Sequence, residues 1–186
     1  RQMCIRDSRK ILHSFESSEK MKKHMRCFFR HGGMYQVCNS NLLFHASIPM
    51  NPDGTFKSVR ILGQDYKGRA LLDRVDQLIR TAYFKTGEQE EVEYAHDYIW
   101  YLWCGEDAPS FGKDKMATFE RYFVEDKDLW KEKKSAYYTL YNEKSVCEMI
   151  LREFGLTDQY AHIINGHVPV KTLKGENPVK AGGKLL

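Results

Sequence analysis

The stretch Ala161–Val170, with the sequence AHIINGHVPV, gives the strongest indication of the fold. Ile163 and Ile164 form a short apolar run that is typical of a buried strand, and Asn165-Gly166 ends this run with a turn. His167 therefore follows the end of a predicted strand. Because glycine lets backbone and ligand approach closely, a histidine beside it can offer a neutral imidazole nitrogen to a metal ion. The alternative is a loop histidine that hydrogen-bonds to a neighbour.

The earlier stretch Asn41–Pro49, with the sequence NLLFHASIP, repeats this pattern. Its apolar residues Leu42 to Phe44 run directly into His45, and small residues and a proline follow. His45 is therefore also predicted to lie at the end of a strand. Open sheets place ligand sites at the ends of their strands. We therefore expect His45 and His167 to meet at one edge of a sheet.

Both stretches resemble segments of the calcineurin-like metallophosphoesterases. Leu42–Pro49 resembles the LLxHGxxP segment of that superfamily, and Ile164–Pro169 resembles its Gly-His segment. In the superfamily both histidines bind one ion of a two-metal centre, so the resemblance implies that His45 and His167 are metal ligands. Ala46 stands where the superfamily usually has glycine. Alanine allows fewer backbone conformations at this position, but it leaves the implied metal ligand His45 in place.

Longer segments narrow the resemblance to the class III fructose-1,6-bisphosphatases of bacteria, from about Ser14 to the last residue. The segments follow one another in the order found in that family, and it is their number and order that make the match specific. They are MYQVCNSNLLFH (34–45), YKGRALLD (66–73), WYLWCG (100–105), FGKDKMATFERYF (111–123), HIINGHVPVK (162–171) and KAGGKLL (180–186).

The resemblance implies an enzyme of gluconeogenesis that hydrolyses fructose 1,6-bisphosphate to fructose 6-phosphate and phosphate. It also implies a dinuclear Mn²⁺ centre, and imidazole with carboxylates suits that ion. Arg121 is the nearest candidate for an arginine that grips the phosphate, because a guanidinium pairs with phosphate in a bidentate manner. Alternatively, Arg121 pairs with Glu120 or Glu125 on a solvated helix. Lys171 and Lys184 are further candidates for phosphate contacts, because both lie close to His167 in sequence.

The other metal ligands of the superfamily lie in GDxHG, GDxxDRG and GNHE segments, and these 186 residues contain no Gly-Asp-x-His or Gly-Asn-His sequence. We therefore expect residues 9–186 to be the C-terminal portion of a single catalytic domain, truncated at both ends and inactive when isolated. Residues 1–8 look foreign to the rest of the chain. We interpret them as an artefactual extension and expect them to be disordered.

Two other functions stay open from the sequence. One is another calcineurin-like phosphoesterase, acting on phosphorylated Ser/Thr in proteins or on dinucleotide polyphosphates, because the two histidine segments do not select the substrate. The other is a non-catalytic domain that binds anions through Lys171, Lys174 and Lys184. The segments at 100–105 and 111–123 favour the sugar phosphatase.

Composition excludes several classes of protein. The 29 Lys and Arg residues nearly balance the 25 Asp and Glu residues and are spread along the chain, which argues against nucleic-acid binding. No apolar run approaches the roughly 18 residues of a membrane span. The five cysteines form no C-x-x-C pair and are odd in number, so we expect a reducing, cytoplasmic setting. Composition leaves open whether the protein is a homo-oligomer.

Short strands and amphipathic helices alternate along the chain, which predicts a mixed α/β (α+β) fold. The resemblance implies an incomplete layered sandwich of β-sheets flanked by helices. We predict a hairpin around Asn39–Asn41, helices over 68–84 and 88–103, and a helix capped by Ser17 or Ser18 that ends at Gly32-Gly33. On the helix over 88–103, Trp100, Tyr101 and Trp103 are expected to serve core or interdomain packing. His96 is expected to be a core histidine satisfied by one hydrogen bond.

Overall fold

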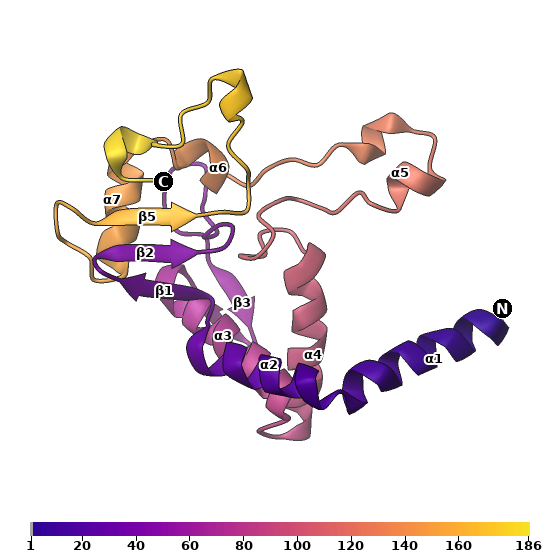
Figure 1. The fold of residues 1–186 in the computed structure, drawn as a ribbon. Helices are drawn as coiled ribbons and strands as arrows, with labels where there is room; N and C mark the ends of the chain where they lie inside the picture. The colour runs from indigo at the N-terminus through magenta and orange to yellow at the C-terminus, as the bar shows by residue number, and fades with distance from the viewer. Residues whose placement is uncertain (1) are drawn as a thin grey trace. The chain divides into compact units, whose positions relative to one another are not determined.

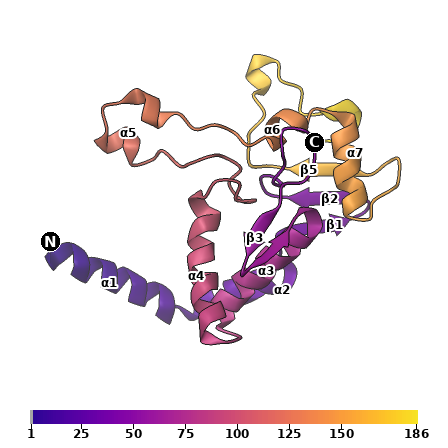
Figure 2. The ribbon, with the colours of Figure 1, turned by 180° about the vertical axis from the view of Figure 1, so that it is seen from behind.

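The computed structural model describes residues 2–186, with side chains from Arg6 onward. The chain divides into two compact units, Arg1–Gly33 and Met34–Leu186, and each is described by itself (Figures 1 and 2). Among the described residues, no helix is both long and apolar enough to cross a membrane. The elements, in chain order, are α1 (Gln2–Ser17), α2 (Glu19–His31), β1 (Tyr35–Cys38), β2 (Asn41–Phe44), β3 (Val59–Ile61), β4 (Gln64–Tyr66), α3 (Gly68–Phe84), α4 (Gln89–Cys104), α5 (Glu120–Phe123), η1 (Lys127–Trp130), α6 (Tyr137–Leu140), α7 (Lys144–Glu153), β5 (His162–Asn165), η2 (Thr172–Lys174) and η3 (Ala181–Gly183).

The first unit consists of helices α1 and α2. The Ser18 side chain accepts a hydrogen bond from the Met21 N–H at 3.2 Å, and α2 ends at Gly32, so the predicted capped helix is confirmed. The expected disorder of residues 1–8 is wrong for its described part, because α1 begins at Gln2; Arg1 lies outside the described residues. No glycine or proline interrupts this stretch, so nothing in it breaks a helix.

The second unit contains a three-stranded sheet with the order β1-β2-β5. Strands β1 and β2 form the predicted hairpin, and Asn39 and Ser40 at its turn both have positive φ, as a tight hairpin turn requires. Strand β5 pairs with β2 in parallel, with Leu42 opposite Ile163. Both strands therefore end at the same edge of the sheet. Strands β3 and β4 form a separate antiparallel pair.

The second unit has two apolar cores. The first buries residues of β2, β5, α6 and α7, including Leu42 and Ile163, which are fully buried. The second joins α3 and α4, which cover almost the same residues as the two predicted helices. Apolar side chains at helical spacing thus meet between these helices, as expected. The mixed α/β class is confirmed.

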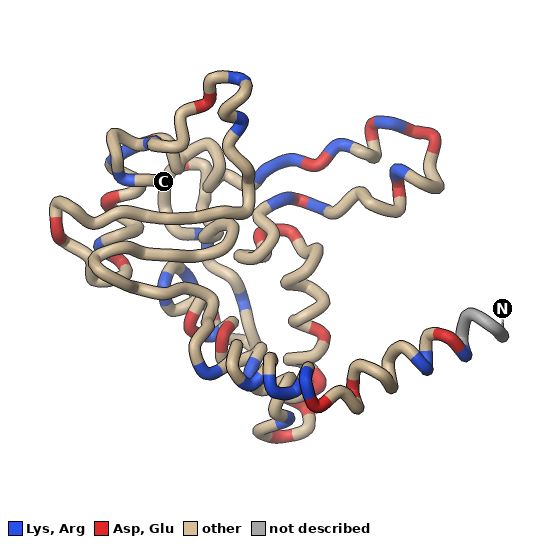
Figure 3. The backbone as a smooth tube through the Cα atoms, in the orientation of Figure 1, with Lys and Arg blue, Asp and Glu red and all other residues tan. Residues whose placement is uncertain are grey.

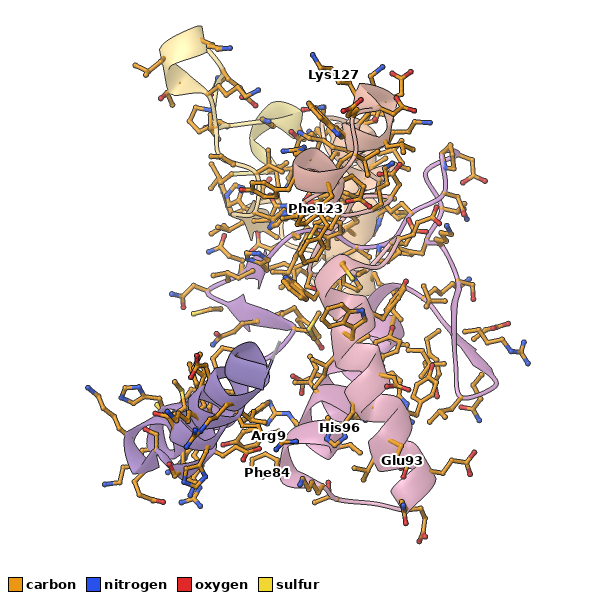
Figure 4. The ribbon with its side chains drawn as sticks, turned by 90° about the vertical axis from the view of Figure 1, so that its right-hand side faces the viewer. Arg9, Phe84, Glu93, His96, Phe123 and Lys127 are labelled. Atoms are coloured by element: carbon orange, nitrogen blue, oxygen red, sulfur yellow. The ribbon has the colours of Figure 1, made fainter. Side chains whose placement is uncertain are left out.

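The aromatic residues of α4 do not pack as expected. Ala95, Tyr98 and Leu102 form its buried face, which turns Trp100 and Trp103 outward to exposures of 62% and 56%. The two tryptophans are therefore not part of the core, and the other expected role, packing between domains, stays a prediction; Tyr101 does pack at the edge of the second core. His96 is also exposed, contrary to its predicted core position. Its ring nitrogen Nε2 nevertheless makes the predicted hydrogen bond, at 3.0 Å from the Ala82 carbonyl (Figure 4).

Residues 113–134, which lie between α4 and α6 in the chain, form an arm that extends away from the rest of the second unit (Figures 1 and 2). The arm closes at its root through an antiparallel bridge between Lys113 and Lys134 and a hydrogen bond from the Asp114 N–H to the Lys133 carbonyl at 2.9 Å. It carries α5 and η1, and α5 lies at its outer end (Figure 1). Basic and acidic residues are interspersed along it (Figure 3).

Candidate metal centre

The two histidines singled out in the sequence meet at the carboxyl edge of the sheet. His45 directly follows β2, and His167 follows β5 after Gly166. Because the two strands are parallel neighbours, both histidines leave the sheet on the same side. His45 Nε2 and His167 Nδ1 lie 2.9 Å apart, and the ring centroids are 4.9 Å apart. The prediction that the two imidazoles come together is confirmed.

Backbone hydrogen bonds tie the two histidine loops together. The His45 carbonyl accepts hydrogen bonds from the N–H groups of Gly166 at 3.2 Å and His167 at 3.0 Å. These bonds continue the pairing of β2 and β5 beyond the last strand residues. The His45 carbonyl therefore fixes the backbone of the His167 loop relative to that of His45, and so holds the two side chains close together.

The partly buried side chain of Asn165 links the two histidine loops to the first core. The Asn165 side-chain amide donates to the Ala46 carbonyl at 2.8 Å and to the Tyr137 hydroxyl at 3.0 Å. The Tyr138 hydroxyl also donates to the Ala46 carbonyl, at 3.3 Å. Tyr137 is fully buried in the first core. Through Asn165, the core thus fixes the backbone that follows His45.

The surroundings of His167 favour its neutral form. Burial lowers the pKa of His167, and the neighbouring His45 and the positive charge of Lys113 lower it further. A neutral imidazole is the form that binds a metal ion, since protonation blocks the ligating nitrogen. The His167 ring therefore stays neutral at a lower pH than an ordinary histidine does.

This electrostatic setting predicts a pH titration. In the metal-free protein, His167 is expected to titrate below the ordinary histidine value of 6.5, as measured by NMR of the imidazole ring protons. Near this pKa the folded state then binds fewer protons than the unfolded state. The contribution of His167 to the free energy of unfolding is therefore fully present above pH 6.5 and is lost as the pH falls through the lowered pKa of the folded state. His45→Gln should move the midpoint of His167 upward. A midpoint at or above 6.5 in the unchanged protein would contradict this account.

The described residues contain no group of three or more His, Cys, Asp and Glu side chains that could hold a metal ion. His45 and His167 thus supply two nitrogen donors and no nearby carboxylate in this part of the chain. Whether they bind metal stays a prediction. The pair alone would leave most of the coordination of an ion to water or to other ligands.

Arg121 lies on α5 in the arm, and α5 is distant from the ends of β2 and β5 (Figures 1 and 2). Its guanidinium is 3.8 Å from Glu132 Oε1 and donates to the Trp130 carbonyl at 3.4 Å. The expected ion pair is therefore with Glu132, not with Glu120 or Glu125. The structure does not bring Arg121 to the histidine pair, and its proposed phosphate contact stays a prediction.

The two lysine candidates differ in position. Lys184 is buried, and its ammonium donates to the carbonyls of Gln159 at 2.6 Å and Ala161 at 3.2 Å. These carbonyls precede β5, so Lys184 lies at the opposite end of that strand from His167, which corrects the expectation that it contacts phosphate there. Lys171 is exposed on the chain after His167, and its backbone N–H donates to Glu176 Oε2 at 3.0 Å.

The sequence analysis missed Lys113, whose charge acts on His167. This lysine lies within the FGKDKMATFERYF segment that carried part of the resemblance, but no spacing linked it to either histidine. Its position depends on Gly112, which contacts the loop after His45. A lysine directly after a glycine in a loop was the available signal, and it is too common in sequences to be specific.

The family model described as Firmicute fructose-1,6-bisphosphatase matches residues 6–186. The chain belongs to this family.

Relatives named fructose-1,6-bisphosphatase class 3 are similar over nearly the whole chain. Those of Parabacteroides distasonis and Bacteroides fragilis are 80% identical over 178 residues and 67% identical over 177 residues, covering 96% and 95% of this chain. That of Clostridium acetobutylicum is 52% identical over 177 residues and 95% of this chain. The chain spans 27% of the length of each of these relatives. No solved structure matches.

Proposed function

We propose that the complete protein, meaning this chain within a polypeptide of its relatives' length, hydrolyses fructose 1,6-bisphosphate to fructose 6-phosphate and phosphate. The observation that carries the proposal is the 2.9 Å approach of His45 Nε2 and His167 Nδ1 at the shared edge of two parallel strands. The relatives' name, fructose-1,6-bisphosphatase class 3, supports the choice of substrate.

We propose Mn²⁺ as the metal, in a dinuclear centre of which this chain supplies the histidine ligands. The donors fit an ion in kind, because His45 Nε2 and His167 Nδ1 lie 2.9 Å apart and each imidazole could present a neutral nitrogen to the same ion. Imidazole suits manganese when carboxylates complete the coordination. The remaining ligands would come from sequence outside these 186 residues, so the chain alone should bind metal weakly and turn over little substrate.

The residues of this chain would hold and orient the centre. His45 and His167 would each present one neutral ring nitrogen, and the shared His45 carbonyl would keep both loops in register. Asn165 and Tyr137 would fix the backbone behind them. Divalent ions, when bound, would neutralise phosphate charge and lower the pKa of a water molecule toward neutral pH.

The biological setting follows from the same proposal. A fructose-1,6-bisphosphatase acts in gluconeogenesis, and we propose a cytoplasmic protein that binds a sugar bisphosphate, with no nucleic-acid or membrane partner. Two features support this setting: the near balance of basic and acidic residues in the sequence and, among the described side chains, the free cysteines Cys27, Cys38, Cys104 and Cys147. Association into a homo-oligomer would be consistent with exposed aromatic side chains such as Trp100 and Phe123.

A substrate comparison tests the proposal. The manganese-loaded complete protein is assayed for phosphate release from fructose 1,6-bisphosphate, a Ser/Thr phosphopeptide and a dinucleotide polyphosphate, with and without a chelator. We expect release that depends on manganese and that is at least tenfold faster, by kcat/KM, for the sugar bisphosphate. Preference for either other substrate would favour another metallophosphoesterase. No hydrolysis of any of the three would overturn the proposed function.

A further inference from the structure

Gly112 lies where three segments of the second unit meet. Its φ is +65°, and a Cβ atom at this position would lie 2.7 Å from Ser47 Oγ, 3.2 Å from Ser47 Cβ and 2.8 Å from Tyr138 Cε2. Its carbonyl accepts a hydrogen bond from the N–H of Ser135, directly after the arm, at 3.0 Å. The loop after His45, helix α6 and the root of the arm therefore meet at a position that only glycine can occupy without strain or a clash.

The two side chains that crowd Gly112 have little room to move aside. Ser47 is 2% exposed, and its N–H donates to the Pro109 carbonyl at 3.0 Å. Tyr138 is 7% exposed, and its ring packs edge-on against the ring of Tyr137 with 5.4 Å between centroids. Because protein interiors are close-packed, a methyl group added at Gly112 would displace these neighbours.

Both crowded side chains lie on the backbone beside His45 or hold it. Ser47 is the second residue after His45. The Tyr138 hydroxyl donates to the carbonyl of Ala46, which directly follows His45, at 3.3 Å. A displacement of Ser47 or Tyr138 would therefore move the His45 ring away from the position in which its Nε2 lies 2.9 Å from His167 Nδ1.

We propose that Gly112 is a positioning residue for the metal centre. The absence of a side chain at this position lets Ser47 and Tyr138 pack closely enough to hold the His45 ring where it can ligate manganese. The inference rests on the proposed function and adds to it a residue that touches neither metal nor substrate. Loss of a group that supports a metal ligand typically lowers metal affinity or activity by about 10- to 100-fold.

The test compares Gly112→Ala with Gly155→Ala in the complete protein. Gly155 also has a positive φ, +78°, but a Cβ atom there would have nothing within 4 Å, so the two variants share the backbone strain and differ in the clash. We expect Gly112→Ala to raise the Kd of Mn²⁺, measured by equilibrium dialysis, and to lower kcat/KM for fructose 1,6-bisphosphate, each by about 10- to 100-fold. Gly155→Ala should change both by less than about twofold. Both variants should unfold at a lower urea concentration than the unchanged protein.

Changes at Ser47 separate positioning from stability. Ser47→Ala removes the oxygen nearest to the added methyl group, so in the Gly112→Ala background it should lower the Kd of Mn²⁺ by about threefold or more. It should not restore the urea midpoint, because the strain of alanine at a φ of +65° remains. Ser47→Val crowds the same contact from the other side without straining residue 112, and should raise the Kd of Mn²⁺ by about tenfold. This variant remains informative if Gly112→Ala fails to fold.

The outcomes separate this inference from the proposed function. If Gly112→Ala binds manganese as tightly as Gly155→Ala, or if Ser47→Val binds it as tightly as the unchanged protein, Gly112 does not position the site. Recovery of manganese affinity only in step with the urea midpoint would also overturn the inference, because a purely structural role predicts that pattern. An unchanged protein that binds no manganese would instead overturn the metal centre of the proposed function.

Discussion

Replacing His45 or His167 by alanine is expected to lower kcat/KM of the complete protein by about a thousandfold, because each change removes one of the two nitrogen donors at the edge of the sheet. Bound manganese should fall in parallel, as measured by metal analysis after gel filtration. The two side chains lie 2.9 Å apart and would act on the same ion, so the double variant should lose little more activity than either single variant.

His96→Gln is the control for this experiment. His96 makes a single hydrogen bond, to the Ala82 carbonyl on α3, and a glutamine amide can replace that donor. Activity and manganese content should stay within about twofold of the unchanged protein. If the His45 and His167 variants kept both their activity and their manganese, the two histidines would not be metal ligands, whatever their geometry.

Truncation of Tyr137 is expected to have the largest effect on stability. Its side chain is fully buried, its ring makes an edge contact with Phe44 at 5.8 Å between centroids, and its hydroxyl accepts the Asn165 amide. Tyr137→Ala should lower the free energy of unfolding by about 3–5 kcal/mol, since it removes this packing and leaves a cavity. Urea denaturation of the metal-free complete protein, followed by far-ultraviolet circular dichroism, measures the change.

Two further variants separate packing from hydrogen bonding at this position. Tyr137→Phe keeps the ring and removes only the hydroxyl, and Asn165 retains its bond to the Ala46 carbonyl, so the expected cost is about 1 kcal/mol. Tyr160→Ala, at a tyrosine that is 70% exposed, should change the stability by less than about 0.5 kcal/mol. Equal losses for Tyr137→Ala and Tyr160→Ala would refute the assignment of Tyr137 to the core.

Local patterns predicted the helices, the hairpin and the histidine pair. The apolar spacing of 68–84 fixes the buried face of α3. The hairpin turn needs positive φ, and Asn39 and Ser40 adopt it there. The histidine pair was predictable because both histidines follow apolar runs, and parallel pairing of such strands brings their ends together. In each case neighbours in sequence carried the information.

The neighbours of the pair could not be predicted in this way. Lys184 lies close to His167 in sequence. In the structure, however, its segment lies beside the start of β5, and its ammonium donates to the Ala161 carbonyl. Lys113 lies far from both histidines in sequence, but Gly112 contacts Ser47 and brings it near them. Likewise, helical spacing on α4 did not reveal that Trp100 and Trp103 face outward, because the adjacent face buries Tyr98 and Leu102.

The sequence by itself determined the family of this chain, its mixed α/β class and the two histidines that stand at strand ends. Only the tertiary structure decided which charged side chains act on them: the charge of Lys113 lowers the pKa of His167, while Lys184 binds backbone carbonyls and Arg121 pairs with Glu132. The physical reason is that strand and helix formation depends on short-range periodicity, whereas contacts between loops depend on packing between residues distant in sequence.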